Sequence, residues 1–142
     1  MVGIELDEAS ERDFLSGMTA FEEKMVNAAV KCVTMLAQKI EEEAVKRAPI
    51  DTGDLQRSIT HSVEPGTFDS KVKGAVFIPA NSPASAYAMY MHEGIYNLGA
   101  ASAAKQASSS VMVGRKYLER ALAENEEAVK AAIQAAVKEA LA

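Results

Sequence analysis

The chain has 142 residues, 49% of them hydrophobic, and a formal net charge of −5 at pH 7. This size and composition predict a single globular domain over residues 1–142. The acidic balance argues against a protein that binds nucleic acid by neutralising phosphates, which needs clustered Lys and Arg. Cys32 is the single cysteine, which excludes an internal disulfide and a cysteine metal cluster. The sequence contains no apolar run of about eighteen residues, so no membrane span is predicted.

The N-terminal third is predicted to contain a short strand and a long helix. Apolar residues alternate with small or polar ones over Val2–Leu6, which is the period of a half-buried strand. A break is expected at Ser16–Gly17. The helix is expected to begin near Thr19, which can form a capping box with Glu22, and to end near Arg47. About thirty residues give a rod of about 45 Å, so part of it should project beyond its own core or pack on a neighbour.

A structural corner is predicted directly after this helix. Pro49 lacks an amide proton and pushes Ala48 out of the α region, so the helix must end there. Asp51 and Thr52 can bond the backbone of the next turn through their side-chain oxygens. Gly53 can take a positive φ without a Cβ penalty. The segment should therefore turn the chain sharply from a helix into an extended run.

An antiparallel hairpin is predicted after the corner. The alternation over Leu55–Val63 favours one strand, Glu64–Thr67 has the composition of a turn, and Lys71–Pro79 favours a second strand. Together with the N-terminal run, these segments predict a small antiparallel sheet of three or four strands.

The C-terminal half is predicted to contain two further helices. Ala84–Ile95 is a compact apolar block that should form a short helix capped by Gly94. Residues 97–110 are rich in Ala, Ser and Gly and are expected to be a mobile loop. A last helix should begin near Gly114 and carry an apolar stripe to Leu141. The expected fold class is α+β, with the small antiparallel sheet packed against the long helix and the C-terminal helix.

Few residues are candidates for acid–base or metal chemistry. His61, His92 and Glu93 are the candidates, but His92 and Glu93 are adjacent and would point about 100° apart on a helix. No second histidine stands at the four-residue spacing of a zinc helix. Packing or surface contacts are therefore favoured for these side chains, no catalytic residue, metal or cofactor is predicted, and an enzyme that uses His92 and Glu93 stays as an alternative.

The Met/Tyr run Met89–Met91 indicates a contact patch, because Met and Tyr suit adaptable interfaces. The ordinary alternative is that these residues belong to the core. The Ala/Ser segment around Lys105 could order against a partner or serve as a linker. The candidate interface residues are Tyr87, Tyr90, Met91, Glu93, Lys105 and Tyr117.

Three segments resemble a known family. Arg47–Ile59 resembles the motif A-P-[VI]-D-T-G-x-L-x-x-S-I, and Tyr87–Gly94 resembles Y-A-x-x-x-E-x-G except that Glu93 directly precedes Gly94. Gly114–Leu122 is similar to R-P-F-L-x-x-A-L, with Lys and Tyr in place of Pro and Phe. The family is that of the tail-completion or head–tail joining (neck, minor tail) proteins of tailed bacteriophages.

The resemblance implies a structural virion protein without enzymatic activity. Such a protein would join a ring homo-oligomer at the head–tail interface, and it could be a monomer in solution. Its partners would be neck, connector or tail-terminator proteins, and DNA would pass nearby without specific binding. Its location would be the tail or neck of the virion, and the host cytoplasm during assembly. The alternative is a homo-oligomeric adaptor or assembly chaperone, which the alanine-rich last helix motivates.

Overall fold

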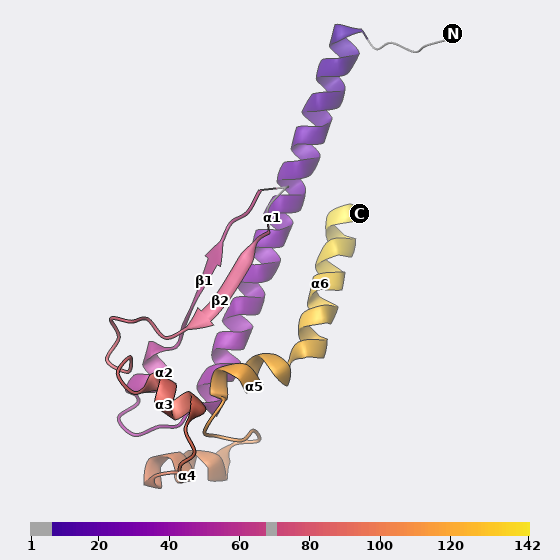
Figure 1. Ribbon diagram of the computed structural model, residues 1–142. Coiled ribbons are helices and arrows are strands. Elements are labelled where there is room, and N and C mark those ends of the chain that lie inside the picture. Colours follow the sequence, from indigo (N-terminus) through magenta and orange to yellow (C-terminus); the bar gives the residue numbers. More distant parts are fainter. Residues whose placement is uncertain (1–6, 68–70) are drawn as a thin grey trace.

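The computed structural model describes residues 7–67 and 71–142 (Figure 1). A long helix, α1 (Glu8–Arg47), forms the axis of the molecule, and a β-hairpin and the C-terminal helices pack along it. The short helices gather around the C-terminal end of α1, whereas its N-terminal end extends beyond the rest of the chain (Figure 1). The strand predicted at Val2–Leu6 lies outside the described residues.

The start of α1 differs from the prediction. Asp7 is the N-cap, and its carboxylate accepts a hydrogen bond of 2.7 Å from the Ser10 amide, which satisfies one of the free donors of the first turn. The predicted start at Thr19 was wrong. Thr19 lies inside the helix, where its hydroxyl donates to the Leu15 carbonyl at 3.0 Å. The predicted break at Ser16–Gly17 is also helical. The 40 residues of α1 give a rod of about 60 Å.

The hairpin consists of β1 (Thr60–Glu64) and β2 (Lys73–Phe77), which pair antiparallel in a register from Thr60 opposite Phe77 to Glu64 opposite Lys73. The predicted antiparallel hairpin is therefore confirmed. Within the described residues the sheet has these two strands, so the larger sheet of three or four strands is not confirmed. Both strands pack against α1. A Cβ at Gly74 would lie 2.8 Å from the Val33 side chain, so the absence of a side chain lets β2 approach the helix closely.

The first part of the segment expected to be extended is a short helix, α2 (Asp54–Ser58). The Arg57 amide donates to the Gly53 carbonyl at 3.1 Å, which closes a helical turn. Leu55 and Ser58 are both buried, and a spacing of three residues reaches one side of the chain only in a helix. A helix is therefore the conformation that buries both residues, and the strand begins only at Thr60.

The chain turns at the end of α1. The chain leaves the helix at Ala48, which has the extended angles φ −69° and ψ 136°. Pro49 follows it and is buried. The Thr52 hydroxyl accepts a hydrogen bond of 3.4 Å from the Asp54 amide. Gly53 has φ +88°, the left-handed conformation that favours glycine.

The segment predicted to be a loop at residues 97–110 contains a helix, α4 (Ala100–Ser108). Ser102 is buried and bonds both backbone groups of Ile50: its hydroxyl accepts from the amide at 2.8 Å and donates to the carbonyl at 2.9 Å. Lys105 donates to the carbonyls of Val45 at 2.6 Å and Ala48 at 2.5 Å. The prediction missed this helix because polar contacts with the corner, rather than an apolar stripe, hold it in place.

Two helices replace the single last helix of the prediction. They are α5 (Tyr117–Ala123) and α6 (Glu126–Leu141). The side-chain amide of Asn125 donates to the Ala121 carbonyl at 2.7 Å, at the point where the chain changes direction. Both helices pack on α1 (Figure 1). The short helix expected in residues 84–95 is present as α3 (Ala88–Glu93), and Gly94 is its C-cap.

A buried ion-pair network joins α1 to α5. The Arg47 guanidinium is buried and donates to the Glu43 carboxylate at 2.7 Å and to the Glu124 carboxylate at 2.6 Å. Lys46 also donates to Glu43 at 2.8 Å. Hydrogen bonds from Lys46 and Arg47 lower the pKa of Glu43 to about 2. These pairs compensate the cost of burying the charges, so removal of one partner would leave another charge unpaired.

The core lies where these elements meet the last turns of α1. It is built mainly from small side chains, and Tyr117 is its largest fully buried residue. The core members are Ile40, Ala44, Ala48, Leu55, Ile59, Ala84, Ala88, Tyr117 and Ala121.

The corner generates a stability prediction. We expect Gly53→Val to lower the free energy of unfolding by about 1–3 kcal/mol, because a β-branched residue at positive φ is strained. Gly17→Ala is the control: Gly17 lies within α1 and an added Cβ meets no atom within 4 Å, so this change should raise stability by about 0.5–1 kcal/mol. Urea denaturation measures both. An unchanged midpoint for Gly53→Val would contradict the role of the corner.

The network around Arg47 generates a pH prediction. The pKa of Glu43 is about 2 in the folded chain against an ordinary value of 4.5. Between these values the unfolded chain binds more protons, so the stabilisation is present above pH 4.5 and is lost as the pH falls toward 2. We expect Glu43→Gln to be less stable than the unchanged chain at pH 7, with a difference that shrinks between pH 4.5 and 2. Thermal unfolding at a series of pH values measures this, with the exposed Glu42→Gln as control; a constant difference would contradict the prediction.

Candidate functional site

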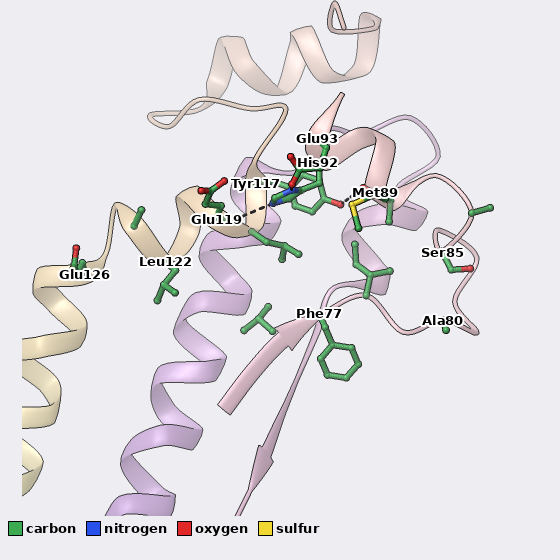
Figure 2. Close-up of a pocket in the computed structure, with 16 residues that line it drawn as sticks. Phe77, Ala80, Ser85, Met89, His92, Glu93, Tyr117, Glu119, Leu122 and Glu126 are labelled. Atoms are coloured by element: carbon green, nitrogen blue, oxygen red, sulfur yellow. Dashed lines mark hydrogen bonds and ion pairs between the residues drawn. The ribbon is translucent and has the colours of Figure 1, made fainter. Parts of the chain in front are cut away.

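A broad apolar groove lies between the end of β2, α3 and α5 (Figure 2). Its volume is about 1100 Å³. Large apolar side chains of its wall are exposed to solvent: Met89 is 72% exposed, Leu122 is 55% exposed, and Phe77 is also exposed. Exposed apolar surface that is hollowed in this way is typical of a site where another protein or a ligand docks.

Acidic side chains stand around this groove. Glu93, Glu119 and Glu126 belong to its lining. Lys116 bridges two of them, with its ammonium 2.5 Å from the Glu93 carboxylate and 3.2 Å from that of Glu119. Hydrogen bonds from Lys116, and next from His92, lower the pKa of Glu93. The rim is therefore acidic, and Lys116 joins the carboxylates of its two helices.

Backbone contacts position the two sides of the groove. The Lys116 amide donates to the His92 carbonyl at 2.7 Å, and the Arg115 guanidinium donates to the carbonyls of Glu93 and Gly94 at 3.2 Å. The free carbonyls at the end of α3 are thus satisfied by the residues that precede α5. Two of the three motif segments noted in the sequence, 87–94 and 114–122, therefore meet in space.

His92 takes part in structural contacts on this surface. Its Nδ1 lies 2.9 Å from the Glu93 carboxylate, and its Nε2 accepts a hydrogen bond of 3.4 Å from the Glu119 amide. This pattern fits the neutral tautomer with its proton on Nδ1. The ring also meets the Tyr117 ring edge to face, with centroids 5.0 Å apart. His92 and Glu93 thus stabilise the junction of α3 and α5.

The remaining titratable candidates are also engaged in packing. His61 contacts the Glu41 carboxylate on α1. Cys32 is half-buried, and its sulfur lies 4.0 Å from the Ala132 carbonyl of α6. Over residues 7–67 and 71–142, no group of three or more His, Cys, Asp or Glu side chains could hold a metal ion. None of the helices in these ranges is long and apolar enough to cross a membrane.

The structure divides the predicted interface residues into two groups. Tyr87 and Tyr90 are exposed on or near α3, Glu93 lies on the rim of the groove, and Met91 is half-buried against the core. The ring centroids of Tyr90 and Tyr96 lie 5.9 Å apart, so Tyr90 packs on a neighbouring ring of the same chain.

Two of the predicted interface residues, the buried Tyr117 and the half-buried Lys105, are engaged in contacts within the chain. Tyr117 is 0% exposed, and its hydroxyl donates to the Ala88 carbonyl at 3.0 Å. Burial raises the pKa of Tyr117. The Lys105 ammonium is occupied by the carbonyls at the end of α1, and burial lowers its pKa to about 8. Tyr117 therefore belongs to the core, whereas Lys105 donates hydrogen bonds to the end of α1 and stays partly exposed.

Two of the exposed apolar residues of the groove were not predicted from the sequence. Phe77 lies in the predicted second strand and Leu122 on the apolar stripe of the predicted last helix, and neither was predicted to be exposed. A stripe predicts that apolar residues share a face, but it does not say how much of that face a neighbouring element covers. Met89 stood within the Met/Tyr run that indicated a contact patch, which is the one local signal for this surface.

The comparisons with known proteins identify the family. A family model described as "Bacteriophage HK97-gp10, putative tail-component" matches residues 12–93. Because this span exceeds half of the chain, the protein belongs to the HK97-gp10-like family, as the resemblance at Arg47–Ile59 predicted. The span runs from α1 through the corner and hairpin to the end of α3. No curated protein and no solved structure matches the chain.

Proposed function

We propose that this protein is a structural subunit of a tailed-phage virion that acts in tail completion, at the joint between head and tail. The observation that carries the proposal is the family match, which covers the projecting helix, the corner, the hairpin and α3 as one continuous unit. The tail components of a phage act by binding other virion proteins, so a functional site here should be a contact surface rather than a catalytic centre.

The exposed surfaces of the chain support an assembly role. The acid-rimmed groove presents Met89 and Leu122, and the projecting end of α1 presents further apolar side chains. Neck, connector or tail-terminator proteins are the proposed partners. Tyr87, Tyr90 and Glu93, which lie on α3 or beside it, are proposed to contribute to these contacts.

We further propose that copies of the chain form a ring in the particle, with DNA passing through its centre. The net charge of −5 supports passage without binding, because an acidic surface repels the phosphate backbone. Virion assembly would take place in the host cytoplasm, and the mature location would be the tail or neck. The side chains of His92 and Glu93 are assigned a structural role rather than catalysis.

A homo-oligomeric adaptor or assembly chaperone is the second candidate. The alanine-rich last helix motivates it, because small residues allow close approach of a partner. Ala132 and Ala136 of α6 line a groove beside α1, so this small-residue surface is partly open. The two candidates differ in one observable property: a tail-completion subunit stays in purified virions, whereas an assembly chaperone is absent from them.

Removal of the gene tests the proposal directly. We expect a phage that lacks this protein to accumulate DNA-filled heads and separate tails, because the joint cannot be completed. Negative-stain electron microscopy of the lysate measures this, with complementation from a plasmid as control. Normal joined virions from the mutant would contradict the proposed function.

The groove generates a second prediction in the same phage. We expect Met89→Asp combined with Leu122→Asp to lower the infectious titre by about tenfold or more, because central apolar contacts carry much of the binding energy of an interface. Ile95→Asp is the matched control, since Ile95 is 87% exposed and does not line the groove. Circular dichroism checks the fold of each purified variant. An equal loss of titre with Ile95→Asp would contradict a specific role for the groove.

A further inference from the structure

The N-terminal part of α1 carries a mixed acidic and apolar face beyond the end of α6. The ammonium of Lys24 lies 3.3 Å from the Ala142 carbonyl, so α6 ends beside Lys24 and the preceding turns of α1 project past it (Figure 1). Glu8, Glu11, Leu15, Met18 and Glu22 follow steps of three and four, which place them on one helical face. Leu15 is 62% exposed and Met18 is 42% exposed. These five residues are called the stripe.

A groove of opposite charge runs along the seam between α1 and α6. Its volume is about 570 Å³. Its lining contains three exposed lysines, Lys24, Lys31 and Lys39, and one acidic residue, Glu139, so its formal charge is positive on balance. Its apolar part contains the exposed Met35 together with alanines of α6, whose small side chains would let another helix approach closely. This surface is called the lysine groove.

The stripe and the lysine groove match in length and in charge. At about 1.5 Å per residue, Glu8 and Glu22 stand about 21 Å apart, and Lys24 and Lys39 stand about 22 Å apart. The carboxylates at the two ends of the stripe can therefore meet the ammonium groups at the two ends of the groove, while Leu15 and Met18 contact its apolar middle. The groove beside α3 does not fit the stripe, because its acidic rim would repel the carboxylates of the stripe.

We propose that the stripe of one copy of this protein docks in the lysine groove of a second copy. The groove cannot hold the stripe of its own copy, because α1 is one continuous helix and its N-terminal turns cannot fold back onto its middle. The match in length and charge between two surfaces of the same chain therefore points to a second copy as the occupant. The stripe and the groove are different surfaces, so the contact is head-to-tail, and a head-to-tail contact closes into a ring when the rotation allows. The inference rests on the proposed function in one respect, which is that the assembly formed is the ring proposed for the particle.

Sedimentation velocity of the full chain tests the contact in solution. We expect the average mass to rise with protein concentration in about 0.05 M salt and to fall again in 1 M salt, because the screening length shortens to about 3 Å. A chain that stays monomeric at every concentration in low salt would overturn the proposal.

Charge reversal tests which surfaces are used. We expect Lys24→Glu with Lys31→Glu, and separately Glu11→Lys with Glu22→Lys, each to raise the dissociation constant of self-association by about tenfold or more. Lys73→Glu with Lys138→Glu is the matched control: it changes the net charge by the same amount as the first variant, on exposed residues that do not line the groove. Lys39 is left unchanged because it also pairs with Glu43 at 3.5 Å.

Mixing the two reversed variants provides the decisive result. An acidic groove should accept a basic stripe, so a mixture of the groove variant and the stripe variant should regain association that neither shows alone. Circular dichroism checks folding, and the stripe variant changes only the projecting turns, outside the core. Equal effects of the control variant, or a mixture that does not associate, would overturn the proposal. Association in solution by a protein that is absent from purified virions would instead contradict the proposed function and leave this contact intact.

Discussion

The fold depends on how the last carbonyls of α1 are satisfied after Pro49 ends the helix. A helix leaves its final carbonyls without intrahelical donors, and burying them unpaired would be costly. Distant segments supply the donors: Lys105 of α4 bonds Val45 and Ala48, and the Gly114 amide bonds Arg47 at 2.8 Å. One helix end thereby fixes the positions of α4 and of the segment that leads into α5. The corner is therefore an organising centre of the domain.

The buried Arg47 network orients α5 relative to the end of α1. Glu43 and Glu124 reach the same guanidinium from α1 and from the end of α5, so the direction in which the chain leaves α5 is set by charge geometry. As a result, the two ends of α1 differ in character. The C-terminal end is surrounded by the four short helices α2, α3, α4 and α5 and by the core, while the N-terminal end projects with an exposed acidic and apolar face. A rigid body with one free arm is suited to assembly with neighbours, which is what a virion subunit requires.

Much of the α+β organisation was predictable because it follows from local rules. Pro49, Gly53 and the alternation around Thr60–Glu64 specify the helix end, the left-handed residue and the hairpin through backbone sterics and periodicity. The errors occurred where local signals compete. Thr19 with Glu22 is a good capping box, yet Asp7 caps the helix earlier, since nothing at Ser16–Gly17 prevents the helix from continuing. Ser102 and Lys105 hold α4 through hydrogen bonds to residues about fifty positions away, and no periodicity reveals such contacts.

The amino-acid sequence by itself determined the family, the long helix, its end at Pro49 and the hairpin, because each depends on residues close together in the chain. Only the tertiary structure decided which apolar residues remain exposed. Tyr117 and Met89 both suggested a contact surface, but Tyr117 is enclosed by α3 and the core while Met89 faces the open groove. The lysine groove likewise exists only because α6 lies beside α1 at the height of Lys24–Lys39. The physical reason is that exposure depends on which elements pack together, and packing joins residues that lie far apart in the sequence.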